Sequence, residues 1–248
     1  MKSIHIPNVN TRYWCAIALA SLFGTNLGDM WAHNSGLNKL VGLIPLAILA
    51  AGVFLLERRD RAPRELYYWL VIAIIRTGAT NIADYFKKII SWPLFGGILA
   101  AIMIATAIWS LQSLRSDSTE EVEAERHGMP QAGTAYWCAM LSAGVLGTFY
   151  GDVAWKAIGM APATAGLGLL LLAAVALWFG LKGQRFWLYW LVVAIARTFG
   201  TAAGDFLAED PMIGLNLPIA TAITGAAFIG VLTLWRGDKA VSLREQAA

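Results

Sequence analysis

The sequence predicts an all-α polytopic membrane protein with eight transmembrane helices, arranged as two four-helix halves. Three observations lead to this fold class: an apolar composition, eight apolar runs of membrane-spanning length, and one motif that occurs four times. Of the 248 residues, 58% are hydrophobic and only 14% are charged, whereas a soluble domain carries about 25% charged residues.

The apolar runs give the number of expected helices. A helix of about 20 residues crosses the hydrocarbon layer of a bilayer. Runs near this length occupy residues 13–32, 37–56, 66–86, 92–112, 135–158, 162–181, 186–208 and 212–235. The first run lacks a small-residue cleavage site and its pattern returns later in the chain, so we expect a structural helix there and no cleavable signal peptide.

Basic residues favour a topology with both termini in the cytoplasm. With eight spans, one side of the membrane carries Lys2, Arg12, Arg58, Arg59, Arg61, Arg64, Arg115, Arg126, Lys182, Arg185, Arg236, Lys239 and Arg244. The opposite side carries only Lys39, Lys87, Lys88 and Lys156. Cytoplasmic loops hold the excess of Lys and Arg, which gives the orientation. The net charge of +3 is spread over these loops, so nucleic acid is not an expected partner.

One motif, Y-W-x9-[GA]-T-x2-[GA]-D, occurs four times without a gap. The copies are YWCAIALASLFGTNLGD at 13–29, YWLVIAIIRTGATNIAD at 68–84, YWCAMLSAGVLGTFYGD at 136–152 and YWLVVAIARTFGTAAGD at 189–205. Six fixed positions in four copies exceed what composition alone produces, which indicates an internal repeat. Copies one and three resemble each other most, as do copies two and four, so the chain divides into two halves.

Each repeat consists of a helix that carries the motif and a plainer helix that follows it. Because each repeat crosses the membrane twice, the four motif helices run in the same direction and the repeats are parallel. We expect a first four-helix membrane half at 1–112, a polar cytoplasmic linker at 113–134, and a second membrane half at 135–248.

Small residues four apart indicate that the motif helices pack together centrally, because such faces let membrane helices approach closely. They are Gly24 and Gly28, Ala79 and Ala83, Gly147 and Gly151, and Gly200 and Gly204. The plain helices are then expected outside, facing lipid. The Tyr-Trp pair that opens each motif is typical of the aromatic belt at a membrane interface, so we expect a structural, interfacial role for it.

Packing does not explain the aspartates that end the motifs, Asp29, Asp84, Asp152 and Asp205. Each lies 15 residues after the tryptophan of its motif, about 22 Å along a helix, which places it in the outer third of the bilayer. A charge that faces lipid there costs on the order of 1–3 kcal/mol, so such residues usually face a bundle interior and mark an ion or substrate path. The alternative is that they reach the outer interface and cap helix or loop termini.

Other polar residues precede the aspartates at steps of four and share their helical face. The stripes are Ser21, Thr25 and Asp29; Arg76, Thr80 and Asp84; Gly144, Thr148 and Asp152; and Arg197, Thr201 and Asp205, with Asn26 and Asn81 beside two of the threonines. An unpaired buried charge is expensive, so Arg76 and Arg197 are expected to pair with carboxylates, and one interpretation is a structural Arg–Asp lock. Two arginines against four aspartates still leave two negative charges, which could hold a divalent cation or take up protons in exchange for one.

The ligand types favour a hard metal ion. Carboxylate, hydroxyl and amide oxygens suit Mg²⁺, Ca²⁺ or Mn²⁺, whereas softer metals prefer Cys or His. The expected metal ligands are Asp29, Asp84, Asp152 and Asp205. His33, four residues after Asp29, is a weaker candidate for a transition metal. No resident cofactor is expected, because the bound metal would be the substrate.

The motif resembles a bacterial family of integral membrane proteins that is defined by a repeat of unknown function. In that family the same Gly-Thr-x-x-Gly-Asp element recurs in each copy. The resemblance runs from Tyr13 to about Trp235, and in the second copy Ala79 and Ala83 replace the glycines, which implies looser packing there. The resemblance implies the fold and a place in the bacterial inner membrane, but no activity.

The leading functional hypothesis is a transporter or channel for a small cation, with a divalent metal ion as the expected substrate. The four aspartates would bind the ion, and Arg76 and Arg197 would balance the charge. The route would be lined by Thr25, Thr80, Thr148, Thr201, Asn26 and Asn81. Besides lipid and the cation, a second copy of the chain is a possible partner, since monomer and homodimer both fit.

Two other function classes remain open. One is a sensor or carrier that binds a small organic or anionic ligand through Arg76 and Arg197. The other is a structural accessory membrane protein in which the polar residues form only interhelical locks. An enzyme is not expected: intramembrane aspartyl proteases resemble G-x-G-D with a Pro-Ala-Leu element, and this sequence has no Pro-Ala-Leu.

Overall fold

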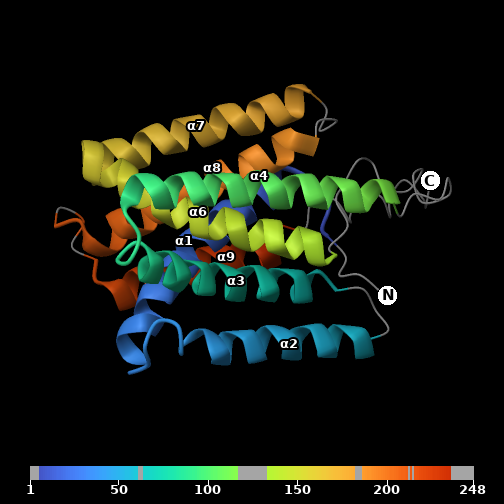
Figure 1. The fold of residues 1–248 in the computed structure, drawn as a ribbon, viewed down its shortest axis with the longest axis horizontal. Helices are drawn as coiled ribbons and strands as arrows, with labels where there is room; N and C mark the ends of the chain where they lie inside the picture. The colour runs from blue at the N-terminus through green and yellow to red at the C-terminus, as the bar shows by residue number, and fades with distance from the viewer. Residues whose placement is uncertain are drawn as a thin grey trace.

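The computed structural model describes residues 6–60, 64–116, 133–181, 186–211, 213 and 215–235, and all regular structure within these ranges is helical. Eight helices are present there (Figure 1), and none of the described residues lies in a strand. They are α1 (Thr11–Asn34), α2 (Leu43–Arg59), α3 (Glu65–Phe86), α4 (Trp92–Ser116), α6 (Thr134–Ile158), α7 (Met160–Gly180), α8 (Phe186–Glu209) and α9 (Leu217–Leu234). Five of them, α3, α4, α7, α8 and α9, are long and apolar enough to cross a membrane. The predicted all-α class with membrane-type helices is therefore confirmed at this level.

Local chemistry sets where the helices begin. The side chain of Asn10 accepts a hydrogen bond from the backbone N–H of Tyr13 at the start of α1, and Asn216 caps α9 in the same way. Such caps satisfy backbone N–H groups that have no partner inside the helix. The runs predicted to begin at residues 37 and 212 begin later, at Leu43 in α2 and Leu217 in α9, where Gly42 and the capping Asn216 precede the helices.

The predicted linker at 113–134 overlaps two helices at its ends. Helix α4 continues to Ser116, and α6 begins at Thr134. Residues 117–132, which make up most of the predicted linker, lie outside the described ranges.

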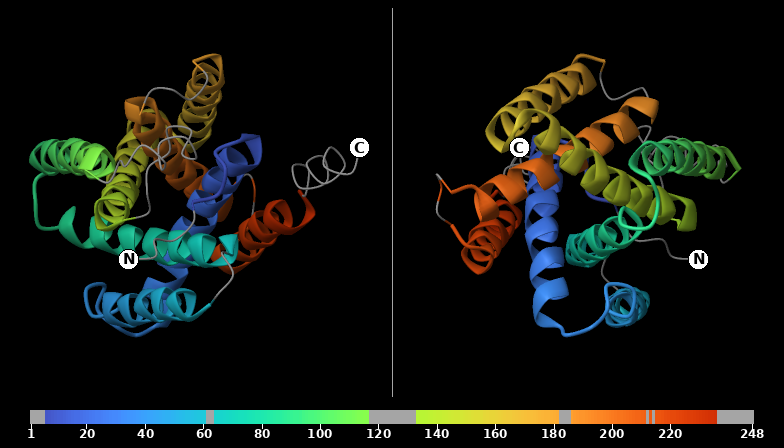
Figure 2. Two further views of the ribbon diagram at one scale, coloured as in Figure 1. Left: turned by 90° about the vertical axis from the view of Figure 1, so that its right-hand side faces the viewer. Right: turned by 60° about the vertical axis from the view of Figure 1, so that its left-hand side comes forward.

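The four motif helices contact one another in a cycle. Helix α1 packs against α3 and α8, and α6 packs against the same two helices from the other side. Each remaining helix packs on the motif helix of the next repeat: α2 on α3, α4 on α6, α7 on α8, and α9 on α1. The left view of Figure 2 shows α2, α4, α7 and α9 around the periphery with the motif helices between them. Since α9 packs on α1, the last repeat closes the cycle with the first.

Small residues allow this close packing. A Cβ atom added at Gly24 would lie 2.4 Å from Cγ of Arg76, and one at Gly147 would lie 2.4 Å from Cβ of Arg197. Both glycines therefore make room for the arginine of the next motif helix. In the second copy an alanine, Ala79, stands at the position of these glycines, and the glycine is on the neighbouring helix. A Cβ atom added at Gly144 of α6 would lie 2.7 Å from Cβ of Ala79. Ala79 is fully buried, and the looser packing expected for this copy stays a prediction.

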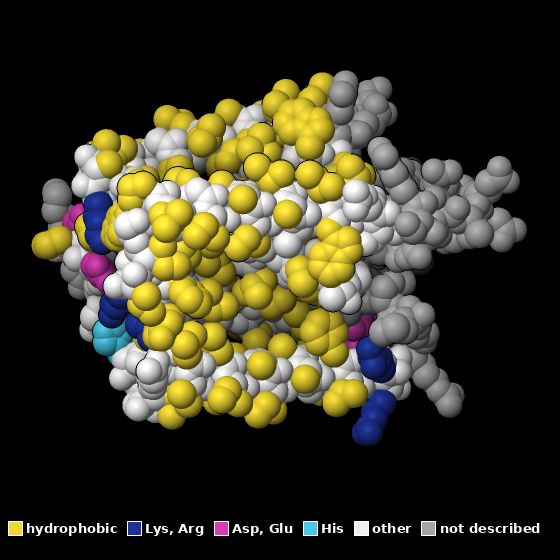
Figure 3. Space-filling view, in the orientation of Figure 1, with side chains coloured by type: hydrophobic (Ala, Val, Ile, Leu, Met, Phe, Trp, Pro, Cys, Tyr) yellow, Lys and Arg dark blue, Asp and Glu magenta, His cyan; other side chains and the backbone are white. Residues whose placement is uncertain are grey.

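The charged side chains visible on the face drawn in Figure 3 lie at the two ends of the helix bundle. Hydrophobic side chains cover the face drawn in Figure 3 between those ends. At one end, Nη1 of Arg12 donates to Oε2 of Glu65 at 2.8 Å, and Nη2 donates to the carbonyl of Leu232 at 2.9 Å. The starts of α1 and α3 and the end of α9 therefore meet at the same end.

Candidate functional site

The candidate site is a column of polar side chains between the four motif helices. It has four levels, which follow the order of the motif from its tyrosine to its aspartate. Most of the side chains in the column are buried. The chemistry of the side chains changes from one end of the column to the other.

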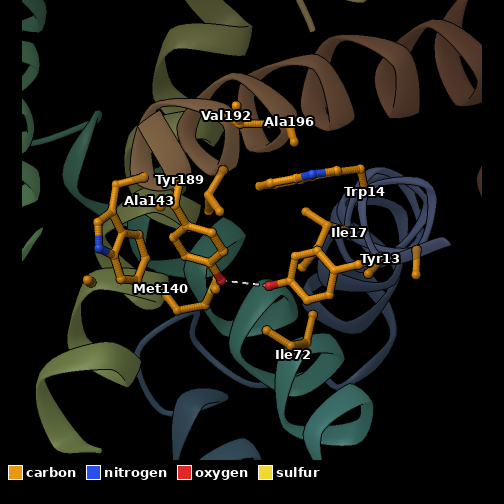
Figure 4. Close-up of a cluster of buried hydrophobic side chains, with 14 of the residues drawn as sticks. Tyr13, Trp14, Ile17, Ile72, Met140, Ala143, Tyr189, Val192 and Ala196 are labelled. Carbon is orange, nitrogen blue, oxygen red and sulfur yellow. Dashed lines mark hydrogen bonds between the residues drawn. The ribbon is translucent and has the colours of Figure 1, made fainter. Parts of the chain in front are cut away.

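The first level is a closed ring of four tyrosine hydroxyls. The oxygen–oxygen distances around the ring are 2.7 Å for Tyr13–Tyr68, 2.6 Å for Tyr68–Tyr136, 2.8 Å for Tyr136–Tyr189 and 2.6 Å for Tyr189–Tyr13. Figure 4 shows Tyr13 and Tyr189 pointing toward each other across the bundle. Because these residues occupy the same position of each motif, the four motif helices begin at the same end of the molecule.

The expected interfacial belt is wrong for these residues. Each tyrosine of the ring is at most 1% exposed. Three of the four neighbouring tryptophans are also buried, namely Trp14, Trp69 and Trp190. The repeat turns this aromatic pair inward because each tyrosine hydroxyl finds two partners of its own kind, which a buried hydroxyl needs.

Arg197 lies at the second level. Its Nη1 donates to Oγ of Ser21 at 3.1 Å, and its Nη2 contacts Sδ of Met140 at 3.2 Å. The side chain is 1% exposed, and its Nε has no hydrogen-bond partner. Arg197 is thus a buried cation that has only weak neutral acceptors.

Arg76 forms the third level, where its guanidinium contacts all four motif threonines. Nη2 donates to Oγ1 of Thr25 at 2.7 Å and of Thr201 at 2.6 Å, and Nη1 donates to Oγ1 of Thr148 at 2.7 Å. Thr80 lies at 3.5 Å from Nη1. Nη1 also donates to the carbonyl of Gly144 at 3.1 Å. We call Arg76 with these four threonines the arginine collar.

The threonine hydroxyls are oriented to accept hydrogen bonds from Arg76. The hydroxyl of Thr25 donates its proton to the carbonyl of Ser21, four residues earlier, at 2.9 Å. Thr201 donates in the same way to the carbonyl of Arg197, at 3.3 Å. A hydroxyl has one proton and two lone pairs, so its oxygen remains free to accept from Arg76. The collar provides neutral oxygen acceptors for both Nη atoms of the buried guanidinium, while Nε has no hydrogen-bond partner among the described residues.

No Arg–Asp lock is present in the described part of the chain. Ion pairs are found there between other residues, but neither Arg76 nor Arg197 lies within 4.0 Å of a carboxylate oxygen. The expected pairing of the two arginines with the motif aspartates is therefore wrong. The threonine stripe replaces it at Arg76.

The fourth level contains the aspartates, and lysines contact two of them. Nζ of Lys87 lies 2.6 Å from Oδ1 of Asp84 and also donates to Oδ2 of Asp152. Nζ of Lys39 donates to Oδ2 of Asp84. Sequence reasoning treated both lysines only as loop charges. The available signal was the position of Lys87, three residues after a motif aspartate.

Lys87 is the first residue after α3, and its ammonium is well stabilised. Burial disfavours the charged form, but the carboxylates of Asp152 and Asp84 favour it more strongly, so the pKa of Lys87 lies above its ordinary value. Lys87 is therefore a permanent cation at neutral pH.

The other two motif aspartates have no cationic partner among the described residues. Asp205 is 9% exposed and Asp29 is half-buried. No hydrogen bond or ion pair to either carboxylate is found there. Asp29 lies within electrostatic range of Lys39 and Asp205 within electrostatic range of Lys87, and both lie within range of Asp152 and Glu209. The fourth level thus combines two neutralised carboxylates with two that are not.

The remaining candidate residues differ from one another. Asn81 donates to the carbonyls of Gly28 at 3.3 Å and Thr77 at 3.0 Å, which joins α3 to α1. Asn26 is fully buried, and its amide has no hydrogen-bond partner within the described ranges. His33 contacts the backbone carbonyl of Asp29 through Nδ1 at 2.7 Å. Across the described residues, no three His, Cys, Asp or Glu side chains are gathered closely enough to hold a metal ion.

Comparison with known proteins gives a match for one part of the chain. No curated protein and no solved structure matches the sequence. Residues 188–239 match a family model described as Repeat of Unknown Function (DUF347). These residues include nearly all of α8 and the whole of α9, so the fourth repeat of this chain is similar to a repeat family of unknown function.

Proposed function

We propose that the protein is a membrane carrier for a small cation, with a divalent metal ion as its expected substrate. The single observation that carries this proposal is the unequal charge at the fourth level. Four aspartates stand there with two lysines, and Asp29 and Asp205 have no cationic partner among the described residues. Buried carboxylates without partners are unfavourable, and a bound cation would relieve this.

A membrane topology with eight spans supports this function. Helices α1 and α6 are not among the five helices that are long and apolar enough to cross a membrane, but their polar motif residues, such as Thr25 and Thr148, are buried in the bundle. Helix α2 has 17 residues, about 25 Å at the helical rise. On this basis all eight helices cross the membrane, as four parallel repeats in two halves around the polar column.

The asymmetry of Lys and Arg supports an orientation with both termini in the cytoplasm, and the proposed location is the bacterial inner membrane. The tyrosine ring lies at the cytoplasmic end of the column, because the motif helices begin there. The aspartates lie toward the opposite side, where a cation would enter from outside. Asp29 is half-buried rather than enclosed, which is consistent with access from that end.

A carrier fits the column better than an open channel. The guanidinium of Arg76 occupies the centre of the bundle, with threonines from all four motif helices around it. A fixed positive charge opposes the passage of cations, and the tyrosine ring closes the column again beyond it. A cation bound at the aspartates could therefore cross only with a change of conformation.

The arginine-based alternative has less support. Three hydroxyls and one carbonyl already occupy the four protons on the Nη atoms of Arg76, so few donors are left for an anionic ligand. The purely structural alternative would require every aspartate to be paired. Asp205 argues against it, since its buried carboxylate has no partner in the described part of the chain.

Flux into proteoliposomes tests the proposal. Wild-type protein should take up at least one of Mn²⁺, Ca²⁺ or Mg²⁺, and Asp205→Asn should reduce that uptake by tenfold or more because it removes an unpaired ligand. Asp210→Asn, just beyond the end of α8, is the matched control and should transport like wild type. Equal uptake by wild type and Asp205→Asn would show that the aspartates do not bind the transported ion.

A further inference from the structure

Lys87 bridges two motif helices through its ammonium group. Among the described residues, it is the only lysine that contacts two motif aspartates, Asp84 on α3 and Asp152 on α6. Lys39 reaches the same level from the loop after α1 but contacts Asp84 alone. The ammonium of Lys87 therefore stands between the carboxylates of Asp84 and Asp152 and joins α3 to α6.

The backbone holds Lys87 in this place. Its N–H donates to the carbonyl of Ala83, which continues the hydrogen bonding of α3 by one residue. Its side chain is 19% exposed. Lys88, the next residue, is exposed and forms no ion pair in the described part of the chain. Two adjacent lysines thus differ sharply in their surroundings.

A lysine ammonium resembles a bound metal ion in two respects. It is a compact charge with donors that point to several oxygens, and it reduces the repulsion between carboxylates that share a site. It differs from a metal ion because it is tethered to the chain and carries a single charge. Its ion pairs are with Asp84 and Asp152; among the described residues it forms none with Asp29 or Asp205, although its charge lies within electrostatic range of Asp205.

We propose that Lys87 is a tethered counter-ion that holds the cation site while the site is empty and is displaced by the incoming ion. This inference rests on the proposed function, since it concerns the same aspartates. Asp205, nine-tenths buried and without a partner within the described ranges, is the ligand that remains available while Lys87 occupies Asp84 and Asp152.

The exchange makes Lys87 a determinant of specificity. When a monovalent ion replaces the ammonium, the charge at the carboxylates does not change, so the exchange gives little electrostatic stabilisation. When a divalent ion replaces it, the site gains one positive charge against the unpaired carboxylates. The wild-type site should therefore select divalent over monovalent cations, and loss of the lysine charge should weaken that selection.

Binding to the purified full-length protein tests this with a matched pair of variants. Thermal unfolding is followed during titration with MnCl₂, CaCl₂ and NaCl, because a ligand that binds the folded state raises its stability. Lys87→Gln should reach half of its maximal stabilisation at a MnCl₂ concentration at least tenfold below that of wild type, and NaCl should now stabilise it. Lys88→Gln should stay within twofold of wild type. A Lys87→Gln midpoint within twofold of wild type overturns the proposal.

A second measurement uses the unmodified chain and does not depend on the folding of a variant. An amine-acylating reagent labels lysines, and mass spectrometry gives the ratio of labelling at Lys87 to that at Lys88. MnCl₂ should raise this ratio at least threefold, because the displaced ammonium loses its carboxylate partners. An unchanged ratio at a concentration that stabilises wild type overturns the inference and leaves the proposed function standing. If no cation stabilises either wild type or Lys87→Gln, both the inference and the proposed function are wrong.

Discussion

Arg76 is a buried cation whose hydrogen-bond acceptors are all neutral oxygens. Its four shortest contacts, to Thr148, Thr25, Thr201 and the carbonyl of Gly144, match the four protons on its two Nη atoms. Hydrogen bonds to a charged donor contribute about 1.5–3 kcal/mol each, more than bonds between neutral groups. The collar therefore stabilises the charge and joins all four motif helices through one residue.

Arg76→Lys should consequently destabilise the protein even though it keeps the charge. A lysine ammonium has three protons and no planar fork, so it cannot reach hydroxyls on all four helices at once. The free energy of unfolding should fall by about 2 kcal/mol or more, measured by chemical unfolding in detergent. Arg64→Lys, at an exposed position, should change it little. Equal stability of Arg76→Lys and wild type would mean that the collar contributes only contact, not directed hydrogen bonds.

At the scale of the helices, glycines decide how closely neighbours approach. Gly147 on α6 faces α8 so tightly that an added Cβ would lie 2.4 Å from Cβ of Arg197 and 2.6 Å from its backbone carbonyl carbon. The backbone cannot move aside as a flexible side chain could. This contact fixes the distance between α6 and α8 beside the polar column.

Gly147→Ala should push these two helices apart. Overpacking of this kind costs about 1–3 kcal/mol, and the displacement should also disturb the second and third levels of the column. Gly166→Ala on α7 is the control, because nothing lies within 4 Å of its added Cβ and alanine favours a helix. The unfolding midpoint should fall for Gly147→Ala and should stay the same or rise for Gly166→Ala. A Gly147→Ala protein as stable as wild type would show that the helices can adjust freely.

The sequence predicted the elements better than the directions of their side chains. The apolar runs located the eight helices of the described residues, because length and hydropathy are properties of single segments. The tyrosines were expected at the interface, since their position in the chain gives their depth but not whether they face lipid or protein. Only the packing of four copies together reveals that Tyr13 and its counterparts complete one ring.

The lysines at the aspartates were missed for a related reason. Lys87 stands three residues after Asp84, while the other copies have Ala32, Trp155 and Ala208 at that position. A repeat analysis discards such a singular residue as loop sequence. The partners of Arg76 were misjudged, because opposite charges suggested pairing with the aspartates, whereas the motif threonines, although recognised in the sequence, were expected to line an ion path.

At the scale of the whole molecule, each repeat depends on the next one. Every plain helix packs on the motif helix of the following repeat, and α9 returns to α1. The nitrogens of Arg12 connect the same two helices and α3. The two halves, α1 to α4 and α6 to α9, therefore meet along several helix pairs, including α1 with α8 and α3 with α6.

This arrangement predicts that the halves stay together without a covalent connection. A protease site introduced after residue 124, between α4 and α6, should allow cleavage into two fragments that still migrate as one species in size-exclusion chromatography in detergent. The tyrosine ring and the arginine collar each draw side chains from both halves, so separation would break both. Gly147→Ala, which weakens packing inside the second half, should lower the unfolding temperature of the cleaved protein more than that of the intact chain, because cleavage removes the connection that keeps the halves close. Fragments that separate on cleavage of the wild-type protein would show that the chain connection, rather than the cycle of helix contacts, holds the column together.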